Sequence, residues 1–345
     1  ISIYYAESLE TIGDNIKEIK PEIFSAVPRL IEKVYDKIIV GGSQKPAPLK
    51  QIFFWAVKRA NAYEIGSSQG ILGKIANKLV YSKVREGLGG NVKVIVSGSA
   101  ALQTRLQRFF WGVGLPVLEG YGLTETSPII SVNTLLKKGT QFGTVGKVIE
   151  KVSVKIAEDG EILTKGPNVM LGYYKAPELT EEVMSGEWFH TGDIGVFKHG
   201  FLKITDRKKQ MFKTSGGKYI APGPIENMFK ASPFIEQIMV IGEGKKHASA
   251  LIIPAFAHTK EWSKENGLSC KTNEEICSNK EVIDAISKEI KIYNEHLGQT
   301  EQIKRFELIS KEWTVEGGEL TPTMKAKRKP ILAKYEHLVK KIYNE

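Results

Sequence analysis

An alternation of strand-like and helix-like segments most constrains the fold of this chain. A β-branched run at 92–96 leads into the small residues Ser97-Gly98-Ser99, a helical period follows at 102–111, and a second strand-like segment lies at 116–119. Strands that alternate with helices form a parallel sheet, whose ligand-binding loops lie at the carboxyl ends of the strands. The sequence therefore predicts an α/β fold.

The regions on either side have different patterns. Residues 8–40 have a helical pattern broken at Pro28, and 49–63 have a helical period. Short strands separated by glycine turns begin near 140 and predict a β-rich subdomain over about 140–205. Strands at 235–241 and 248–253 and helical periods at 282–297 and 330–343 predict a small α+β module. We therefore expect a large domain over 1–208 and a small C-terminal domain over 209–345.

The composition excludes several classes of protein. Of the 345 residues 41% are hydrophobic, and no apolar run reaches the roughly 20 residues of a membrane-spanning helix. Two cysteines are too few for a disulfide framework or a zinc site, which fits a cytoplasmic protein. The net charge of +10 comes without a nucleic-acid-binding signature. This positive charge fits phosphorylated ligands, and it also fits a peripheral contact with the anionic inner surface of a membrane.

The motif Gly-Tyr-Gly-Leu-Thr-Glu-Thr-Ser-Pro, which begins at Gly120, is the most informative for function. Tyr121 lies between two glycines, so its ring can meet a planar base closely. The hydroxyl of Thr124 beside the carboxylate of Glu125 suits a hard cation that bridges to phosphate oxygens. Taken alone, the motif also fits an aromatic turn followed by a helix cap.

Three later segments supply further groups that suit a nucleotide. The segment 188–193 ends in Asp193, which can accept hydrogen bonds from two ribose hydroxyls or cap a turn. The segment 206–213 is a cationic run suited to phosphates. The segment 320–328 places Lys325 in a loop near the C-terminus, where a solvated lysine in a basic tail is the alternative.

In this order and spacing the segments resemble the adenylate-forming (AMP-binding) enzymes, most of all the long-chain fatty-acid–CoA ligases (acyl-CoA synthetases). The likeness runs from 24–29 to the C-terminus, and the segments 27–29 and 83–90 favour the long-chain ligases over amino-acid adenylation domains and luciferases. The resemblance implies that a fatty acid, ATP and coenzyme A give acyl-CoA, AMP and pyrophosphate through acyl-AMP, with Mg²⁺ as the metal. It also implies that the small C-terminal domain is mobile and bends near Lys209.

The resemblance assigns roles to the residues of the large domain. It implies that Tyr121 stacks on adenine, that Thr124 contacts phosphate, and that Glu125 is the magnesium ligand. It places further residues of the same domain at the adenine and acyl group, namely Gly98, Ser99, Ala100, Glu119, Gly120 and Gly122. The family commonly has a second glycine or a proline where Ser99 and Ala101 stand.

The resemblance implies a second group of roles further along the chain. Asp193 corresponds to the ribose-binding aspartate, and Arg207 suits the ribose and phosphate region. Lys209 and Lys213 would reach the nucleotide, and Tyr219 would lie by the coenzyme A channel. Lys325, with Thr124 and Glu125, completes the implied catalytic set.

One family element is missing from the sequence. The family's phosphate-gripping loop, rich in serine, threonine and glycine, belongs upstream of residue 1, and Thr214-Ser215-Gly216-Gly217-Lys218 lacks the full spacing of a P-loop. We therefore expect the chain to be the C-terminal portion of a ligase, inactive alone in acyl-CoA synthesis. The alternatives are a non-catalytic fragment that binds a nucleotide or acyl-AMP, and an adenylate-forming enzyme for another carboxylic acid.

Overall fold

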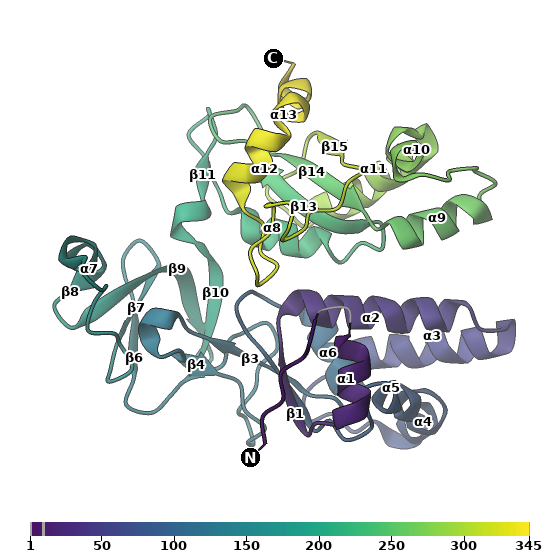
Figure 1. Cartoon of the computed structure of the whole chain (residues 1–345), viewed down its shortest axis with the longest axis horizontal. Helices are drawn as coiled ribbons and strands as arrows, with labels where there is room; N and C mark the ends of the chain where they lie inside the picture. Colours follow the sequence, from purple (N-terminus) through teal and green to yellow (C-terminus); the bar gives the residue numbers. More distant parts are fainter. Residues whose placement is uncertain (1, 9–10, 345) are drawn as a thin grey trace. The chain divides into compact units, whose positions relative to one another are not determined.

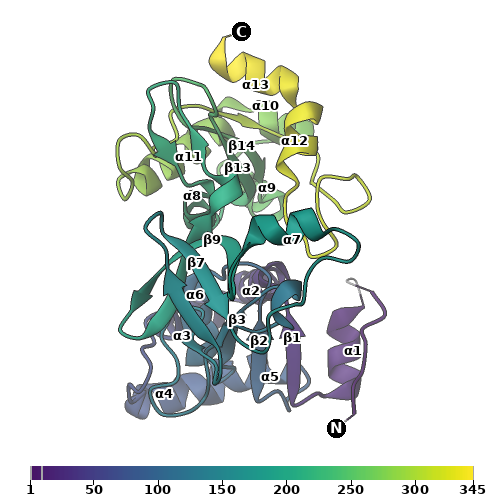
Figure 2. The same cartoon turned by 90° about the vertical axis from the view of Figure 1, so that its left-hand side faces the viewer.

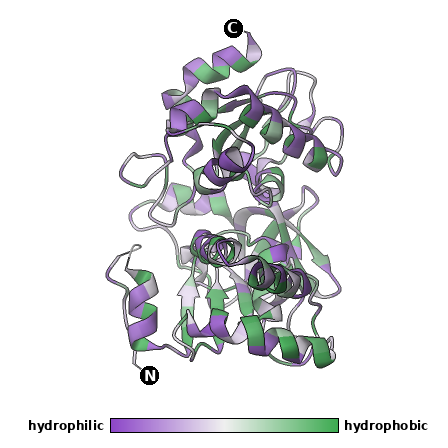
Figure 3. Cartoon of the chain, turned by 90° about the vertical axis from the view of Figure 1, so that its right-hand side faces the viewer, coloured by the Kyte–Doolittle hydropathy of each residue, from purple (hydrophilic) through white to green (hydrophobic). Residues whose placement is uncertain are grey.

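The computed structural model describes residues 2–8 and 11–344. Contacts divide the chain into two compact units, the first formed by Ile1–Thr191 and Val196–Ile204 and the second by Gly192–Gly195 and Thr205–Glu345. Each unit has its own buried hydrophobic residues. The helices and strands of both units are labelled in Figure 1. Apolar and polar segments alternate along the helices of both units, as expected for helices that pack one face on a core (Figure 3).

A five-stranded sheet organises the first unit, in the order β1-β2-β3-β4-β5. Its strands are β1 (Ile23–Ala26), β2 (Val94–Ser97), β3 (Val117–Tyr121), β4 (Ser131–Val132) and β5 (Lys147–Val148). The first three lie side by side and run parallel, whereas β4 and β5 pair antiparallel (Figure 2). The predicted α/β fold with a parallel sheet is therefore confirmed.

The described residues of the first unit form seven helical segments before β3. They are α1 (Ile12–Ile19), α2 (Pro28–Ser43), α3 (Ala47–Asn61), α4 (Gly70–Ala76), a π-helical segment (Asn77–Tyr81), α5 (Ser82–Glu86) and α6 (Thr104–Gly112). Helix α2 starts at Pro28, whose fixed φ suits the first helical turn. Helices α3 and α6 approach so closely that a Cβ on Gly112 would lie 2.7 Å from the Cα of Ala60.

A second sheet has the order β10-β9-β7-β6, and β8 pairs with β9. The elements of this region are β6 (Ser153–Ile156), β7 (Glu161–Lys165), α7 (Pro177–Val183), β8 (Met184–Ser185), β9 (Trp188–Lys198) and β10 (Phe201–Arg207). Ile162 and Leu202 of this region form a small core with Tyr121 and Ile130. This packing joins the end of β3 to the β-rich region.

The second unit is an α+β module with a three-stranded sheet and a separate two-stranded sheet, β11-β12. In the three-stranded sheet β13 and β14 are antiparallel, and β14 and β15 are parallel. Its strands are β11 (Phe212–Lys213), β12 (Tyr219–Ile220), β13 (Ile235–Ile241), β14 (Ser249–Pro254) and β15 (Phe306–Leu308). Its helices are α8 (Pro222–Phe229), α9 (Phe256–Glu265), α10 (Asn273–Ser278), α11 (Lys280–Asn294), α12 (Arg328–Lys334) and α13 (Glu336–Tyr343). Every residue of β14 is buried, as in a strand covered on both faces. Within 2–8 and 11–344, no helix combines the length and the apolarity needed to cross a bilayer.

Candidate functional site

The turn after β3 is tightly constrained, because its backbone at Gly122 lies against the backbone of Pro128. A Cβ on Gly122 would lie 1.6 Å from the carbonyl oxygen of Pro128, so no other residue fits there. The backbone N–H of Leu123 donates to Oγ1 of Thr126 at 2.9 Å, and that hydroxyl lies 3.0 Å from the carbonyl oxygen of Pro128. These contacts fix the short 3₁₀ turn Thr124–Thr126, which leaves Thr124 exposed and Glu125 half-buried.

A segment that the motif analysis missed holds this turn in place. The hydroxyl of Tyr173 donates to Oε1 of Glu125 at 3.0 Å, and the N–H of Met170 donates to the Glu125 carbonyl at 2.8 Å. The amide of Asn168 donates to the carbonyls of Thr126 and Ile129, at 3.1 and 2.9 Å. Burial, together with the hydrogen bond to Glu125 and its charge, raises the pKa of Tyr173. The phenol therefore stays protonated and remains a donor to the carboxylate.

The Glu125 carboxylate fits a magnesium ion that also binds phosphate. Tyr173 occupies Oε1, and Oε2 has no hydrogen-bond partner among the described residues. Among all the described residues, no group of three or more His, Cys, Asp or Glu side chains is arranged to hold a metal ion. Mg²⁺ commonly takes one or two protein carboxylates and completes its shell with water and substrate phosphates. A single half-buried glutamate beside a hydroxyl suits that mode of binding.

The turn after β2 meets the end of β3, as expected for neighbouring parallel strands. Ser97 pairs in register with Glu119, and a Cβ on Gly98 would lie 3.8 Å from the Gly120 carbonyl oxygen. Ser99 has a φ of 72°, which is uncommon for a residue with a side chain. Ser99 and Ala100 are both exposed. The structure therefore brings the predicted residues 98–100 beside Glu119 and Gly120.

Glu119 is a buried acid at this junction, with 4% of its surface exposed. Its Oε2 accepts a hydrogen bond from the N–H of Leu102 at 3.1 Å, whereas Oε1 has no partner among the described residues. The neighbouring Ser97 Oγ is likewise buried and without a partner in the described chain. Burial raises the pKa of Glu119 to about 8, against a weaker opposing effect of the Leu102 hydrogen bond. The carboxyl group is therefore protonated at neutral pH.

The raised pKa of Glu119 predicts a stability that falls as pH rises. An acid whose pKa is higher in the folded state than in the unfolded state stabilises the fold most at low pH. Glu119 loses this contribution as the pH rises from its unfolded-state pKa to about 8. The loss by pH 8 is on the order of 4 kcal/mol. We expect Glu119→Gln, which keeps an acceptor for Leu102, to match the wild type near pH 5 and to exceed its stability at pH 8 to 9.

Urea unfolding of both proteins across pH 5 to 9 measures this difference. Parallel stability profiles for wild type and Glu119→Gln would contradict a buried, neutral Glu119.

Asp193, Arg207 and Lys325 meet inside the second unit. Arg207 Nε donates to Oδ1 of Asp193 at 3.0 Å, and the Asp193 side chain is 9% exposed. Burial, followed by the nearby Arg207 charge, lowers the pKa of Lys325, and the Asp193 carboxylate opposes this shift. A carboxylate, a guanidinium and a half-buried ammonium group thus lie close together.

The loop that carries Lys325 has a defined conformation. The N–H of Lys325 donates to Thr321 Oγ1 at 3.0 Å, the N–H of Thr321 donates to the Lys325 carbonyl at 2.8 Å, and Met324 has a φ of 62°. At its base Glu319, which sequence analysis missed, is 1% exposed and pairs with Lys334 of α12. The loop is therefore held by its own hydrogen bonds and anchored by the ion pair of the buried Glu319 with the exposed Lys334.

The remaining predicted residues lie nearby in sequence on a short hairpin and turn. Lys213 of β11 pairs with Tyr219 of β12, with its Nζ 5.5 Å from the ring centroid. The segment 214–218 forms the turn between them, closed by a hydrogen bond from Thr214 N–H to the Lys218 carbonyl. Lys209 lies in an exposed 3₁₀ turn, and within 2–8 and 11–344 it has no hydrogen bond or ion pair. The structure thus brings Lys213 to Tyr219 but does not bring Lys209 to either.

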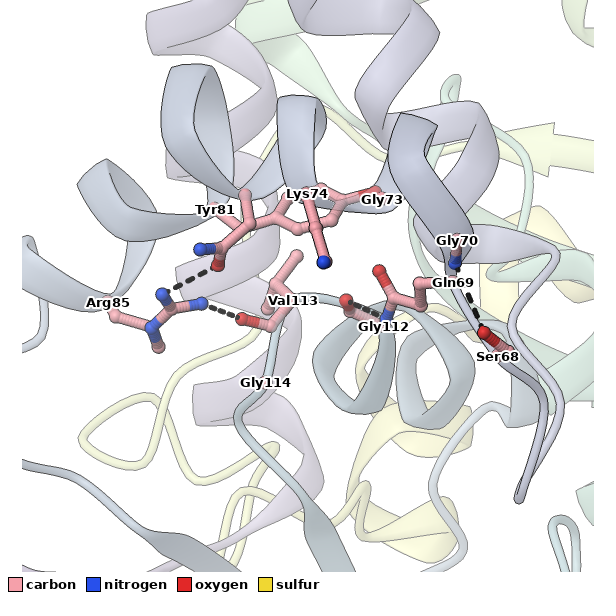
Figure 4. Close-up of a pocket in the computed structure, with 11 residues that line it drawn as sticks. Ser68, Gln69, Gly70, Gly73, Lys74, Tyr81, Arg85, Gly112, Val113 and Gly114 are labelled. Atoms are coloured by element: carbon pink, nitrogen blue, oxygen red, sulfur yellow. Dashed lines mark hydrogen bonds between the residues drawn. The ribbon is translucent and has the colours of Figure 1, made fainter.

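Among the described residues of the first unit, two of the open cavities have volumes of about 440 Å³ each. One is lined by Tyr173, the partner of Glu125, and by its neighbours Leu171, Gly172, Lys175, Ala176, Pro177, Thr180 and Glu181. The other lies at the start of α4, and no predicted site residue lines it (Figure 4). There Arg85 donates to the carbonyl of Val113 at 2.6 Å and to the side chain of Asn77 at 2.7 Å. Only the first of these cavities adjoins the predicted groups.

Comparison with known proteins matches both parts of the chain. The model of the AMP-binding enzyme family matches residues 4–174, and that of the AMP-binding enzyme C-terminal domain matches 209–345. The long-chain-fatty-acid–CoA ligase FadD15 of Mycobacterium tuberculosis is 33% identical over all of this chain and 58% of its own length. Human long-chain-fatty-acid–CoA ligase 6 is 33% identical over 99% of this chain and 50% of its own. The chain thus spans little more than half the length of these relatives.

Solved structures agree on the fold. The adenylation domain of a carboxylate reductase from Mycobacterium chelonae aligns with a TM-score of 0.73 at 22% identity, over 99% of this chain and 49% of its own. The O-succinylbenzoate coenzyme A synthetase of Bacillus subtilis, solved with ATP and magnesium, aligns with a TM-score of 0.58 at 18% identity, over 93% of this chain and 54% of its own. With both family models matched in order along the sequence, the chain belongs to the AMP-binding enzyme family.

Proposed function

We propose that the protein activates a long-chain fatty acid with ATP and transfers the acyl group to coenzyme A. The observation that carries this proposal is the cluster of Asp193, Arg207 and Lys325, which offers an acceptor for ribose hydroxyls beside two cations for phosphate. The choice of a long-chain acid rests on relatives named as long-chain ligases at 33–34% identity.

The reaction has two halves. The fatty-acid carboxylate attacks the α-phosphorus of ATP, which forms acyl-AMP and releases pyrophosphate. The thiolate of coenzyme A then attacks the acyl carbonyl and releases AMP. Since the attacking groups belong to the substrates, the protein needs no nucleophile of its own. Its contribution is positioning and charge neutralisation.

We assign the phosphate end of ATP to Thr124, Glu125 and Lys325. Thr124 contacts a phosphate oxygen, and Glu125 holds Mg²⁺, which neutralises phosphate charge when it is bound. Tyr173 orients the Glu125 carboxylate through its 3.0 Å hydrogen bond. Lys325 brings its ammonium group to the α-phosphate and the attacking carboxylate. Its lowered pKa reflects a partly dehydrated site, where a charge acts more strongly on a substrate.

The nucleoside end is assigned to the loops after β2 and β3 and to Asp193. Asp193 accepts the ribose hydroxyls, and Arg207 supports it. The adenine contacts are Gly98, Ser99, Ala100, Glu119, Gly120, Tyr121 and Gly122. Lys209 and Lys213 reach the nucleotide, and Tyr219 lies by the coenzyme A path. The small domain is assigned to 209–345, the range of the C-terminal family model, with the bend at Lys209.

Release of AMP by the full-length protein tests the proposed function. The panel contains long-chain, short-chain and aromatic carboxylic acids, each with and without coenzyme A. We expect turnover that requires coenzyme A and is fastest with the long-chain acids. Turnover only with aromatic or short acids would favour the alternative of a different carboxylic acid. ATP binding without turnover on any acid would favour a non-catalytic binding protein.

Asp193→Ala should raise the KM for ATP by roughly tenfold or more and change kcat much less. Ribose contacts persist in the ground state and the transition state, so their loss weakens binding in both. A hydrogen bond to a charged group is worth about 1.5–3 kcal/mol. Asp193→Asn is the matched control, since it keeps one acceptor and should lose less. A fall in kcat at unchanged KM would contradict the ribose assignment.

A further inference from the structure

Helical residues 70–86 expose apolar side chains that no described residue covers. Helix α4, the π-helical segment and α5 follow one another from Gly70 to Glu86 without a break. Their inward face is formed by small and apolar residues at helical spacing, namely Gly73, Ala76, Val80, Tyr81 and Val84. Most positions between them are exposed to solvent. A helix at the surface of a globular protein ordinarily carries polar side chains on its exposed face.

Four aliphatic side chains gather on that outward face. Ile71 is 77% exposed, Leu72 52%, Ile75 43% and Leu79 44%. At about 3.6 residues per turn, positions separated by one, four and eight fall within a single stripe of about 100°. Contiguous exposed apolar side chains mark interaction sites, whereas single scattered ones need no explanation.

Exposed lysines border the aliphatic stripe, and their positive charge favours an anionic partner. Lys74 and Lys78 lie along one side of the stripe and Lys83 along the other, and all three are exposed. None of them has an ion-pair partner in the described chain, and Glu86 is the only acid in the range 70–86. The cavity at the start of the segment adds one more basic group, because Arg85 lines it together with Lys74 (Figure 4).

We propose that residues 70–86 dock the protein on an anionic lipid bilayer, with the aliphatic stripe in the interface and the lysines on the headgroups. An apolar face bordered by cations is the pattern of helices that lie in the membrane plane. Basic residues near an anionic surface strengthen such binding one by one. A protein partner would need an acidic rim around an apolar groove, whereas a bilayer of acidic lipids offers both features at any point.

Co-sedimentation with vesicles tests the docking surface, using phosphatidylcholine alone or mixed with phosphatidylglycerol. We expect the wild type to bind the mixed vesicles, to bind pure phosphatidylcholine at least tenfold less, and to weaken as salt rises. Ile71→Glu should weaken binding to mixed vesicles by roughly tenfold. Its control is Leu136→Glu, at a side chain that is also 77% exposed but lies outside this segment, and it should bind as the wild type does.

The charge is tested separately from the apolar stripe. Lys74→Gln with Lys78→Gln should weaken binding to mixed vesicles by about twenty-five-fold, at roughly fivefold for each lysine. The matched control is Lys33→Gln with Lys37→Gln, which removes two exposed lysines at the same spacing from α2. Equal losses in the two pairs would show only a general charge effect and would overturn the proposal.

A reporter variant gives an outcome that does not depend on loss of binding. Leu72→Trp should shift its tryptophan emission to the blue when mixed vesicles are added, because the ring moves into the interface. No shift would overturn the proposal. A wild-type protein that is a dimer without lipid, and becomes a monomer in Ile71→Glu, would assign the stripe to self-association instead. None of these experiments measures ligase activity, so their results are independent of whether the proposed function is correct.

Discussion

Lys325→Ala should abolish acyl-AMP formation and leave the second half-reaction near its normal rate. The ammonium group is needed while negative charge builds on the α-phosphate and the attacking carboxylate. Once acyl-AMP exists, the thiolate attacks a carbonyl group that is already activated. In the proposed function, the flexible Lys325 side chain leaves the site when the small domain bends at Lys209. The effect on the first step should reach several orders of magnitude.

Single-turnover assays on the full-length protein separate the two halves. The first follows acyl-AMP from fatty acid and ATP, and the second follows thioester from preformed acyl-AMP and coenzyme A. Thr323→Ala is a control on the same loop and should retain both steps. Equal loss in the two steps would assign Lys325 a structural role, and no loss in either would make it a solvated lysine.

Glu125→Ala should cut adenylation by orders of magnitude and weaken its dependence on Mg²⁺. The variant removes the only protein carboxylate assigned to the ion, and with it several kcal/mol of transition-state stabilisation. Initial rates at increasing Mg²⁺ measure the effect. Near-normal rates at ordinary Mg²⁺ would show that the metal assignment is wrong.

Tyr173→Phe separates the orientation of Glu125 from its charge. The carboxylate remains, but the donor 3.0 Å from its Oε1 is lost. We expect a loss of about tenfold or less, with a higher Mg²⁺ requirement that saturating metal restores. A loss as large as that of Glu125→Ala would mean that Tyr173 does more than orient the carboxylate.

Local sequence signals predicted the strand–helix–strand core well. The β-branched run at 92–96 and the helical period at 102–111 correspond to β2 and α6, and the segment at 116–119 to β3. Strand β1 was missed because it interrupts a stretch with a helical pattern at 8–40. Its partner is β2, about 70 residues away, where Ile23 pairs with Val94. Such a pairing leaves little trace in the local sequence.

The predicted site residues came from contiguous motifs, and the missed ones act across long distances in the chain. Tyr173 is 48 residues from Glu125 in the sequence, and a pair of tyrosines after glycine in a loop gave no reason to single it out. Glu319 and Lys334 are 15 residues apart on different elements. Burial of Glu119 likewise depends on how β2 and β3 pack, so its raised pKa could be found only in the structure.

Exchange of labelled pyrophosphate into ATP tests most directly the central claim that the protein forms acyl-AMP from a long-chain acid. The assay uses the full-length protein without coenzyme A, so that only the first half-reaction runs. We predict exchange that requires a long-chain fatty acid, and that is lost in Lys325→Ala. Exchange that is absent with every acid, or that proceeds equally without any acid, would contradict the account.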